Sequence, residues 1–393
     1  MITTFERCKR LYQTTAVIAL NTILLFGVLY CILAGVFALR DAWKTRPENN
    51  LVSRDYGIEA LRKAYPGWED SEIHQLLFEH WMRPAEYEPF TQYLEAPFRG
   101  QFLTVHPAGF RHIPDQAPWP PRPDHFNIFL FGGSTTFGYG LPDDQTLAAF
   151  LQPILQALHP EVALYNFGRA GYYSSQELTL FQRLLADGIQ PDLAVFIDGM
   201  NEFFYENDEP LHTARLKTVV NSRYTEGFET RNPAVRLARN LQRYLRSMSN
   251  PQAPPPPTKA ATATRVAKAV DRYLHNCRQA EAVARHYAIP TLFVWQPIPN
   301  YRYNLDLHPF AQFGLKERGP NAEGYQYLEV NREALDLPEN FLWLADIQQD
   351  ATENLYVDQI HYNPILSRQM ALSLADKIHV QIDSKAVTNE QSQ

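Results

Sequence analysis

Short apolar runs alternate with stretches of helical spacing from about residue 127 to residue 380. The runs are "NIFLFGG", "VALYNFG", "DLAVFIDG", "PTLFVWQP" and "LWLADI", and helical patterns such as "SSQELTLFQRLLADG" and "PILSRQMALSLADKIH" separate or follow them. This alternation is typical of a parallel sheet with helices on both faces. The pattern therefore predicts one three-layer α/β/α domain with a five-stranded parallel sheet.

The longest apolar run lies near the start of the chain. From Thr14 to Leu39 there are 26 residues without a charge. As a helix they would extend about 39 Å, more than the roughly 30 Å of a hydrocarbon core. A cleaved signal peptide is the alternative, but the run is too long for one and no small-residue cleavage site follows. We therefore predict a transmembrane helix over 14–39, preceded by a tail of residues 1–13.

The rest of the chain predicts attached segments and no second core. Residues 40–121 form an extended and helical segment that packs on the α/β domain, with an amphipathic helix in "WEDSEIHQLLFEHW" and a short strand pair or ordered loop in "APFRGQFLTVHPAGFRHIP". The α/β domain itself spans 122–382. An insertion at about 202–264, which includes a Pro-rich loop over 250–264, interrupts this domain. Residues 383–393 are expected to be a disordered tail.

Charge and composition exclude several classes of function. The net charge is −7 and the pI about 6.0, and a nucleic-acid partner is therefore not expected. Three isolated cysteines, Cys8, Cys31 and Cys277, cannot form a disulfide framework or a C-x-x-C site, and no histidine pair has zinc-ligand spacing. We expect no metal and no other cofactor.

The stretch "LFGGSTTFGYG", directly after the first run, is the strongest candidate for chemistry. A phosphate-binding P-loop would need a lysine where Tyr139 stands, and a dinucleotide G-x-G-x-x-G is absent. The G-x-S-x-G elbow also fails, because Thr136 replaces its second glycine. A serine at the carboxyl end of a parallel strand remains, and Ser134 would need a base and an oxyanion hole to act as a nucleophile.

The ends of the other strands offer those groups. Gly171 follows the second run in "YNFGRAGYYS", and Asn201 follows the third in "FIDGMNEF". After the last run, Asp358 precedes His361 by three residues. That spacing allows the carboxylate to bind one imidazole nitrogen while the other faces Ser134.

In these features the sequence resembles the SGNH hydrolase family, also called GDSL esterases and lipases. Four motifs match in order: Gly132-Gly133-Ser134 for the GDS block, Gly171 for the second-block glycine, Gly199-Met200-Asn201-Glu202 for G-x-N-D, and Asp358 with His361 for D-x-x-H. Glycine replaces the usual aspartate in the first motif, and glutamate replaces it in the third. The resemblance covers about residues 125–380.

The resemblance implies a flavodoxin-like fold and a serine esterase. Ser134, Asp358 and His361 would form the catalytic triad, and the Ser134 N–H, the Gly171 N–H and the Asn201 side chain would form the oxyanion hole. Four further residues are possible substrate contacts: Arg111, Gly133, Glu202 and Gln296.

The resemblance leaves the acyl acceptor open. One hypothesis is a hydrolase of acyl, in particular acetyl, esters, with a cell-envelope or extracellular polysaccharide as substrate. A second is an O-acyltransferase that modifies envelope glycans with the same residues. A third is a non-catalytic glycan-binding or scaffold protein of a polysaccharide assembly.

The side of the membrane also follows only from the resemblance. Three cationic residues precede the apolar run and three follow it, so the positive-inside rule is a tie. The resemblance to envelope enzymes favours a single-pass protein whose catalytic domain is extracytoplasmic.

Overall fold

In the computed structural model the five apolar runs form one parallel sheet with the strand order β6-β5-β7-β8-β9. The structure describes residues 4–44, 46–205, 207–225, 241, 259–313, 315 and 319–391. The strands are β5 (Phe126–Gly132), β6 (Val162–Asn166), β7 (Leu193–Asp198), β8 (Thr291–Trp295) and β9 (Phe341–Trp343). The predicted five-stranded parallel sheet is confirmed.

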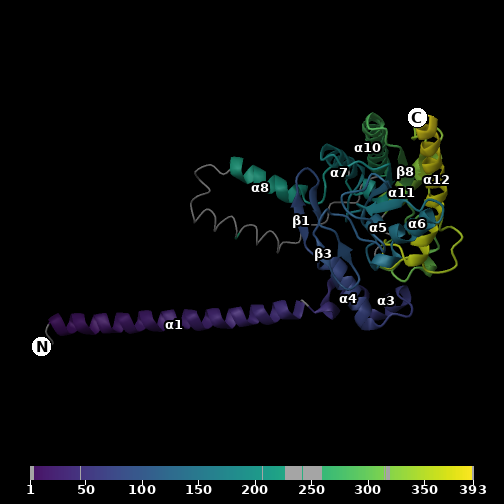
Figure 1. Ribbon diagram of the computed structural model, residues 1–393. Helices are drawn as coiled ribbons and strands as arrows, with labels where there is room; N and C mark the ends of the chain where they lie inside the picture. Colours follow the sequence, from purple (N-terminus) through teal and green to yellow (C-terminus); the bar gives the residue numbers. More distant parts are fainter. Residues whose placement is uncertain are drawn as a thin grey trace.

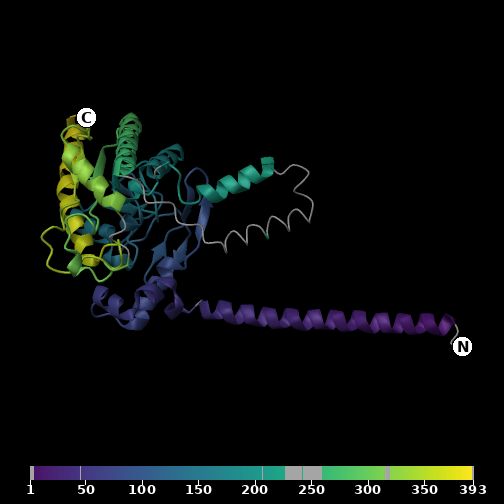
Figure 2. The same ribbon diagram turned by 180° about the vertical axis from the view of Figure 1, so that it is seen from behind.

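Helices cover both faces of this sheet, as Figures 1 and 2 show. Alternate strand residues point to opposite faces. Ile128 and Leu130 of β5 pack in a core with α6 (Leu147–Gln156) and α12 (Pro364–Gln391). Phe129 and Phe131 belong to the other core, which the remaining covering helices complete: α7 (Ser174–Ala186), α10 (Lys259–His286) and α11 (Gly319–Asn331). The predicted three layers are therefore present.

Short helices mark the loops at the carboxyl ends of the strands and elsewhere. Helix α5 (Ser134–Phe137) follows β5 directly, and α8 (Thr213–Thr225) lies in the predicted insertion. Among the described residues the 3-10 helices are η1 (Pro47–Asn49), η2 (Asp143–Gln145), η3 (Met200–Phe203) and η5 (Leu305–Leu307).

The segment before the sheet packs on the α/β domain. It contains α2 (Leu51–Tyr56), α3 (Ile58–Ala64), α4 (Asp70–Trp81), the hairpin β1 (Ala85–Glu88) and β2 (Gln92–Glu95), and the pair β3 (Phe98–Arg99) and β4 (Thr104–Val105). The amphipathic helix and the strand pair are thus confirmed. Ile73, Leu76 and Leu77 of α4 share a buried cluster with Leu141 and Val357 of the α/β domain.

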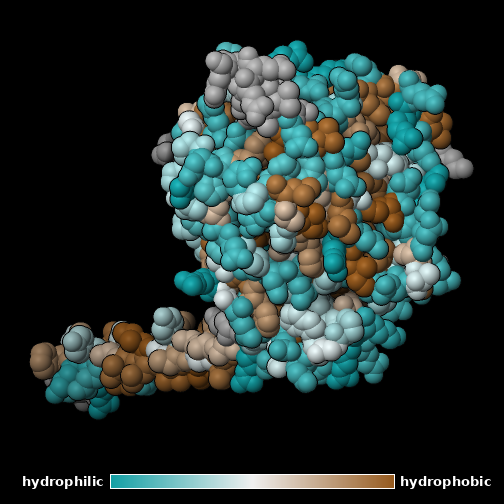
Figure 3. Space-filling model, turned by 45° about the vertical axis from the view of Figure 1, so that its right-hand side comes forward, coloured by the Kyte–Doolittle hydropathy of each residue, from teal (hydrophilic) through white to brown (hydrophobic). Residues whose placement is uncertain are grey.

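Helix α1 (Thr4–Lys44) projects from the rest of the molecule. Its residues 4–39 are long and apolar enough to cross a membrane, and none of the apolar window is buried. Figure 3 shows apolar side chains along α1 beside a body whose visible face is largely hydrophilic. The helix is a candidate membrane span, longer at both ends than the predicted one.

Two boundaries differ from the sequence prediction. Helix α10 begins at Lys259, inside the segment expected to be a Pro-rich loop up to residue 264, and α12 continues to Gln391 through the tail expected to be disordered. In both places the chain continues a helix that packs on the sheet, and adding residues to an existing helix costs less than starting one. The amphipathic pattern "NPAVRLARNLQRYLRSMS" and most of the Pro-rich loop lie outside the described residues.

Candidate active site

Ser134 is the first residue of α5, two residues after β5 ends. The Asn201 side chain lies against the backbone of Gly133, the residue before Ser134. A Cβ on Gly133 would lie 2.5 Å from Asn201 Nδ2. Only glycine fits at this approach. Gly133 therefore brings the amide of a residue beyond β7 next to the serine, and it does so by having no side chain.

His361 and Asp358 reach Ser134 from the segment that precedes α12. The Ser134 Oγ and His361 Nε2 are 2.8 Å apart, and His361 Nδ1 is 2.6 Å from Asp358 Oδ2. His361 and Asp358 are each 3% exposed. The three side chains therefore form one continuous line of hydrogen bonds from a buried carboxylate to a serine hydroxyl.

Local backbone contacts hold the Asp358-to-His361 turn in place. The second carboxylate oxygen of Asp358 accepts hydrogen bonds from the N–H groups of Ile360 and His361, both at 2.9 Å, and the Val357 N–H donates to the His361 carbonyl. Burial alone would raise the pKa of Asp358, but the charge and hydrogen bonds of His361 and these N–H groups outweigh it and lower the pKa. Asp358 is thus held as a carboxylate.

Three hydrogen-bond donors lie at the ends of β5, β6 and β7. Among the described residues, the N–H groups of Ser134 and Gly171 have no backbone acceptor. Asn201 Nδ2 donates to the Tyr172 carbonyl at 2.7 Å, which leaves its second hydrogen for another acceptor. Gly171 has a φ of +68°, a conformation that favours glycine. Such a set can stabilise a negative oxygen beside Ser134.

Two aromatic residues that sequence analysis did not select flank His361. The Tyr139 ring stacks on the imidazole at 5.6 Å, and the Trp81 ring meets it edge to face at 5.8 Å. Trp81 is 39% exposed. Trp81 ends the apolar stripe of α4, so its pattern indicated packing, and Tyr139 was noticed only as the residue that replaces a P-loop lysine.

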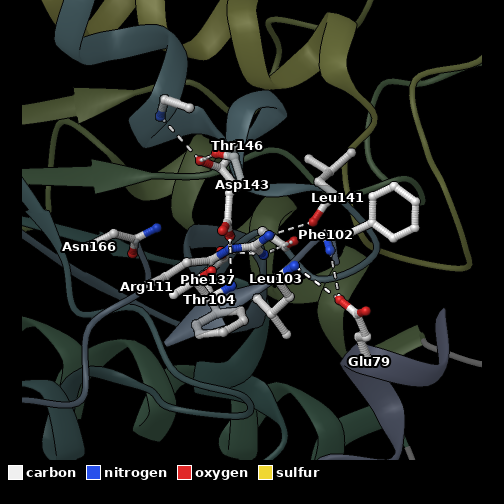
Figure 4. Close-up of polar contacts among 12 residues, drawn as sticks. Glu79, Phe102, Leu103, Thr104, Arg111, Phe137, Leu141, Asp143, Thr146 and Asn166 are labelled. Carbon is white, nitrogen blue, oxygen red and sulfur yellow. Dashed lines mark hydrogen bonds and ion pairs between the residues drawn. The ribbon is translucent and has the colours of Figure 1, made fainter. Parts of the chain in front are cut away.

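Arg111, expected as a possible substrate contact, is instead fully buried (Figure 4). Its guanidinium donates to the carbonyls of Phe137, Gly138 and Leu141 and to the carboxylate of Asp143. The donors are engaged within the protein, at the loop that follows Ser134. The substrate role is therefore corrected to a structural one.

Glu202 and Gln296 are also buried, 0% and 2% exposed. Glu202 accepts a hydrogen bond from the Ser174 N–H at 2.7 Å and pairs with Arg272. Gln296 Oε1 accepts hydrogen bonds from the hydroxyls of Thr135 and Tyr362. Both side chains form hydrogen bonds within the protein and hold neighbouring loops, which corrects the expected role in substrate binding to a structural one.

The part of the chain that the structure describes contains no group of three or more His, Cys, Asp or Glu side chains arranged to hold a metal ion. The polar groups gathered at Ser134 are those of nucleophilic acyl transfer: a hydroxyl, a base, a buried carboxylate and a set of N–H donors.

The model of the GDSL-like Lipase/Acylhydrolase family matches residues 130–327, half of the chain. This range includes Ser134, Gly171 and Asn201, and it ends before Asp358. A search of curated proteins finds no match.

Several solved structures match the chain at low identity and low TM-score. One is a G-D-S-L family protein from Desulfitobacterium hafniense, with 12% identity over 64% of this chain and 99% of that chain and a TM-score of 0.33. Another is a lipolytic G-D-S-L family protein from Veillonella parvula (11%, 63%, 94%, TM-score 0.32). A third is an acetylxylan esterase from Geobacillus stearothermophilus (14%, 64%, 93%, TM-score 0.32).

Proposed function

The chain belongs to the GDSL-like lipase/acylhydrolase family, and from this premise we propose that it is an ester hydrolase in which Ser134 is the nucleophile. The observation that carries the proposal is the line of hydrogen bonds from Asp358 through His361 to Ser134. A buried Asp, an imidazole and a serine in this order activate a hydroxyl at neutral pH.

In the proposed first step Ser134 Oγ attacks the ester carbonyl while His361 Nε2 takes the hydroxyl proton. Asp358 stabilises the imidazolium. The tetrahedral oxyanion accepts hydrogen bonds from the N–H groups of Ser134 and Gly171 and from Asn201 Nδ2. When the ester C–O bond breaks, His361 gives the proton to the leaving alcohol, and an acyl-enzyme remains.

In the second step a water molecule attacks the acyl carbonyl and gives a proton to His361. The Ser134 ester then breaks, His361 returns the proton to Ser134 Oγ, and the carboxylic acid leaves. Each oxyanion donor contributes to both steps, and the loss of one typically slows such reactions by a factor on the order of a hundred.

For the substrate we propose acetyl esters of a cell-envelope or extracellular polysaccharide. Two observations support this class. Trp81 presents an exposed indole beside His361, a surface suited to the apolar face of a sugar ring. Helix α1 is a candidate span that would keep the enzyme at a membrane, with the catalytic domain on the extracytoplasmic side.

A fluorophosphonate probe tests the nucleophile. We expect the purified chain to be labelled at neutral pH. Ser134→Ala should abolish labelling and ester hydrolysis, because it removes the hydroxyl oxygen that attacks the ester. Folded wild-type protein that resists the probe and hydrolyses no member of an acyl-ester panel would contradict the proposal.

Acetate balance separates hydrolysis from transfer. With an acetylated sugar as donor and a free sugar as acceptor, a hydrolase releases one acetate for each ester cleaved. Acetyl groups recovered on the acceptor in place of free acetate would instead establish an O-acyltransferase, which requires the same catalytic residues.

A further inference from the structure

The hairpin β1–β2 lies before the region that the family model matches, yet it holds the loop that carries Gly171. Glu88 pairs with Arg169, and the Thr91 carbonyl accepts a hydrogen bond from Gln176 at 2.7 Å. Glu95 Oε1 accepts a hydrogen bond from the Ala170 N–H at 2.9 Å. The hairpin is therefore anchored to the loop between β6 and α7 and to the first turn of α7.

A further contact of the hairpin acts on the peptide bond between Ala170 and Gly171. The Tyr93 hydroxyl donates a hydrogen bond to the Ala170 carbonyl. That carbonyl and the Gly171 N–H belong to the same planar, trans peptide, so holding the oxygen also sets the direction of the N–H. A hydrogen bond to an amide oxygen also polarises the amide and strengthens its N–H as a donor.

Packing and burial hold the Tyr93 side chain in place and keep its hydroxyl protonated. It is 5% exposed, and its ring packs edge to face on Tyr172 at 5.4 Å and against His212 at 5.1 Å. Burial raises its pKa, so the phenol keeps its proton at any ordinary pH. A Cβ on Gly171 would lie 3.1 Å from the Tyr93 hydroxyl, so the hydroxyl and the glycine are in close contact.

The same strand also contacts the base. Glu95, two residues after Tyr93, accepts a hydrogen bond from the Tyr139 hydroxyl at 3.2 Å, and the Tyr139 ring stacks on His361. Strand β2 therefore connects the Gly171 loop with the ring that packs on His361.

We propose that Tyr93 is a positioning residue of the oxyanion hole, which orients and polarises the Ala170–Gly171 peptide so that its N–H stabilises the tetrahedral intermediate. This rests on the proposed function. Strand β2 is then part of the active site, although it lies outside the family region.

Tyr93→Phe tests the proposal in the full chain, because phenylalanine keeps the ring contacts and removes only the hydroxyl. We expect kcat for p-nitrophenyl acetate to fall about tenfold, less than the loss of a direct donor would cost, while KM changes less than about twofold. Phenylboronic acid, which forms a tetrahedral adduct on serine, should bind about tenfold more weakly. 4-Aminophenylalanine at position 93 should restore part of kcat, because its N–H can donate to the same carbonyl.

Two controls separate positioning from general stability. Gln176→Met removes a different anchor of the hairpin and should lower Tm without changing kcat. Tyr87→Phe alters an exposed tyrosine of β1 and should change neither quantity.

A wild-type kcat in Tyr93→Phe would overturn the inference, as would an equal fall of kcat in Gln176→Met. A Tyr93→Phe chain that does not fold would leave the decision to the 4-aminophenylalanine chain, whose kcat must approach that of the wild type. Failure of the proposed function is distinct, because the wild-type chain would then neither react with a fluorophosphonate nor hydrolyse the ester.

Discussion

At the scale of single residues, Arg111 shows how the loop behind the nucleophile is held. Its guanidinium donates to the carbonyls of Phe137, Gly138 and Leu141 at 2.5–3.1 Å and to the Asp143 carboxylate at 3.1 Å. Burial lowers the pKa of Arg111 to about 10, so it is still a cation at neutral pH. These carbonyls lie at the end of α5 and in the loop that leads to η2. The Gly138 carbonyl also accepts the Leu141 N–H, and the Leu141 carbonyl lies 2.9 Å from His80 Nε2. Loss of Arg111 would therefore leave mainly the Phe137 carbonyl without a donor and the Asp143 carboxylate without its cation, which is costly.

Arg111→Met should therefore destabilise the protein. We expect the free energy of unfolding to fall by about 2 kcal/mol, the order of the cost of removing the donor of a buried carbonyl, and kcat to fall as the Ser134 loop loosens. Denaturant unfolding and ester hydrolysis measure the two effects.

Arg122→Met is the matched control, because Arg122 forms an exposed ion pair with Asp124. Exposed pairs contribute little, so this variant should unfold like the wild type. If Arg111→Met were as stable as Arg122→Met, the structural role of Arg111 would be wrong.

At the scale of elements, α7, β7 and η3 meet at three buried carboxyl groups. Glu177, Asp198 and Glu202 are 1%, 4% and 0% exposed. Burial, and then their mutual repulsion, raises the pKa of Glu177 and of Asp198, and burial raises that of Glu202 against the opposing charge of Arg272. A carboxyl whose folded pKa is raised stabilises the fold below its ordinary pKa, and this contribution is lost as pH rises toward the folded value.

Glu177→Gln should remove part of this pH dependence. The Glu177 carboxyl lies within hydrogen-bond reach of Asp198, and an uncharged amide of the same shape can donate to that carboxylate, so the substitution costs little. We expect the variant to match the wild-type Tm near about pH 4 and to exceed it increasingly toward about pH 8.

Thermal unfolding across this pH range measures the difference, with Glu323→Gln on the exposed surface of α11 as the control. A Glu177→Gln chain that loses stability relative to the wild type as pH rises would show that the carboxylate is favourable in the fold.

At the scale of the whole molecule, the chain consists of the long exposed helix α1, whose central part is apolar, and a folded body. An exposed apolar surface of this length is rare on a protein in water, and a helix satisfies its own backbone hydrogen bonds in lipid. The arrangement is that of a candidate membrane span attached to a folded body.

Removal of residues 1–45 should convert the protein from membrane-bound to soluble. We expect the full chain to stay in the membrane pellet after carbonate extraction and the truncated chain to stay in the supernatant with unchanged kcat. Release of the full chain by carbonate would rule out a span. A reporter at the C-terminus determines on which side the catalytic domain lies.

The sequence by itself determined the layered fold and was enough to predict the three residues of the candidate triad. Strands such as Phe126–Gly132 and helices such as α7 follow from local periodicity, and the three-residue spacing of Asp358 and His361 is a local feature that closes a turn. Parallel strands place their carboxyl ends at one edge, so Ser134 and Asn201 were expected at the same edge of the sheet, and the pairing of β5 with β7 in the structure makes them neighbours.

Only the tertiary structure decided what the other polar residues do. The sequence shows that Arg111, Glu202 and Gln296 are polar and could contact a substrate. Whether such a side chain faces solvent or a buried partner depends on chain segments far away in the sequence. The bond from Tyr93 to the Ala170 carbonyl spans 77 positions and leaves no periodicity in either segment. Such contacts form because buried polar groups must find partners wherever the packed layers bring them together.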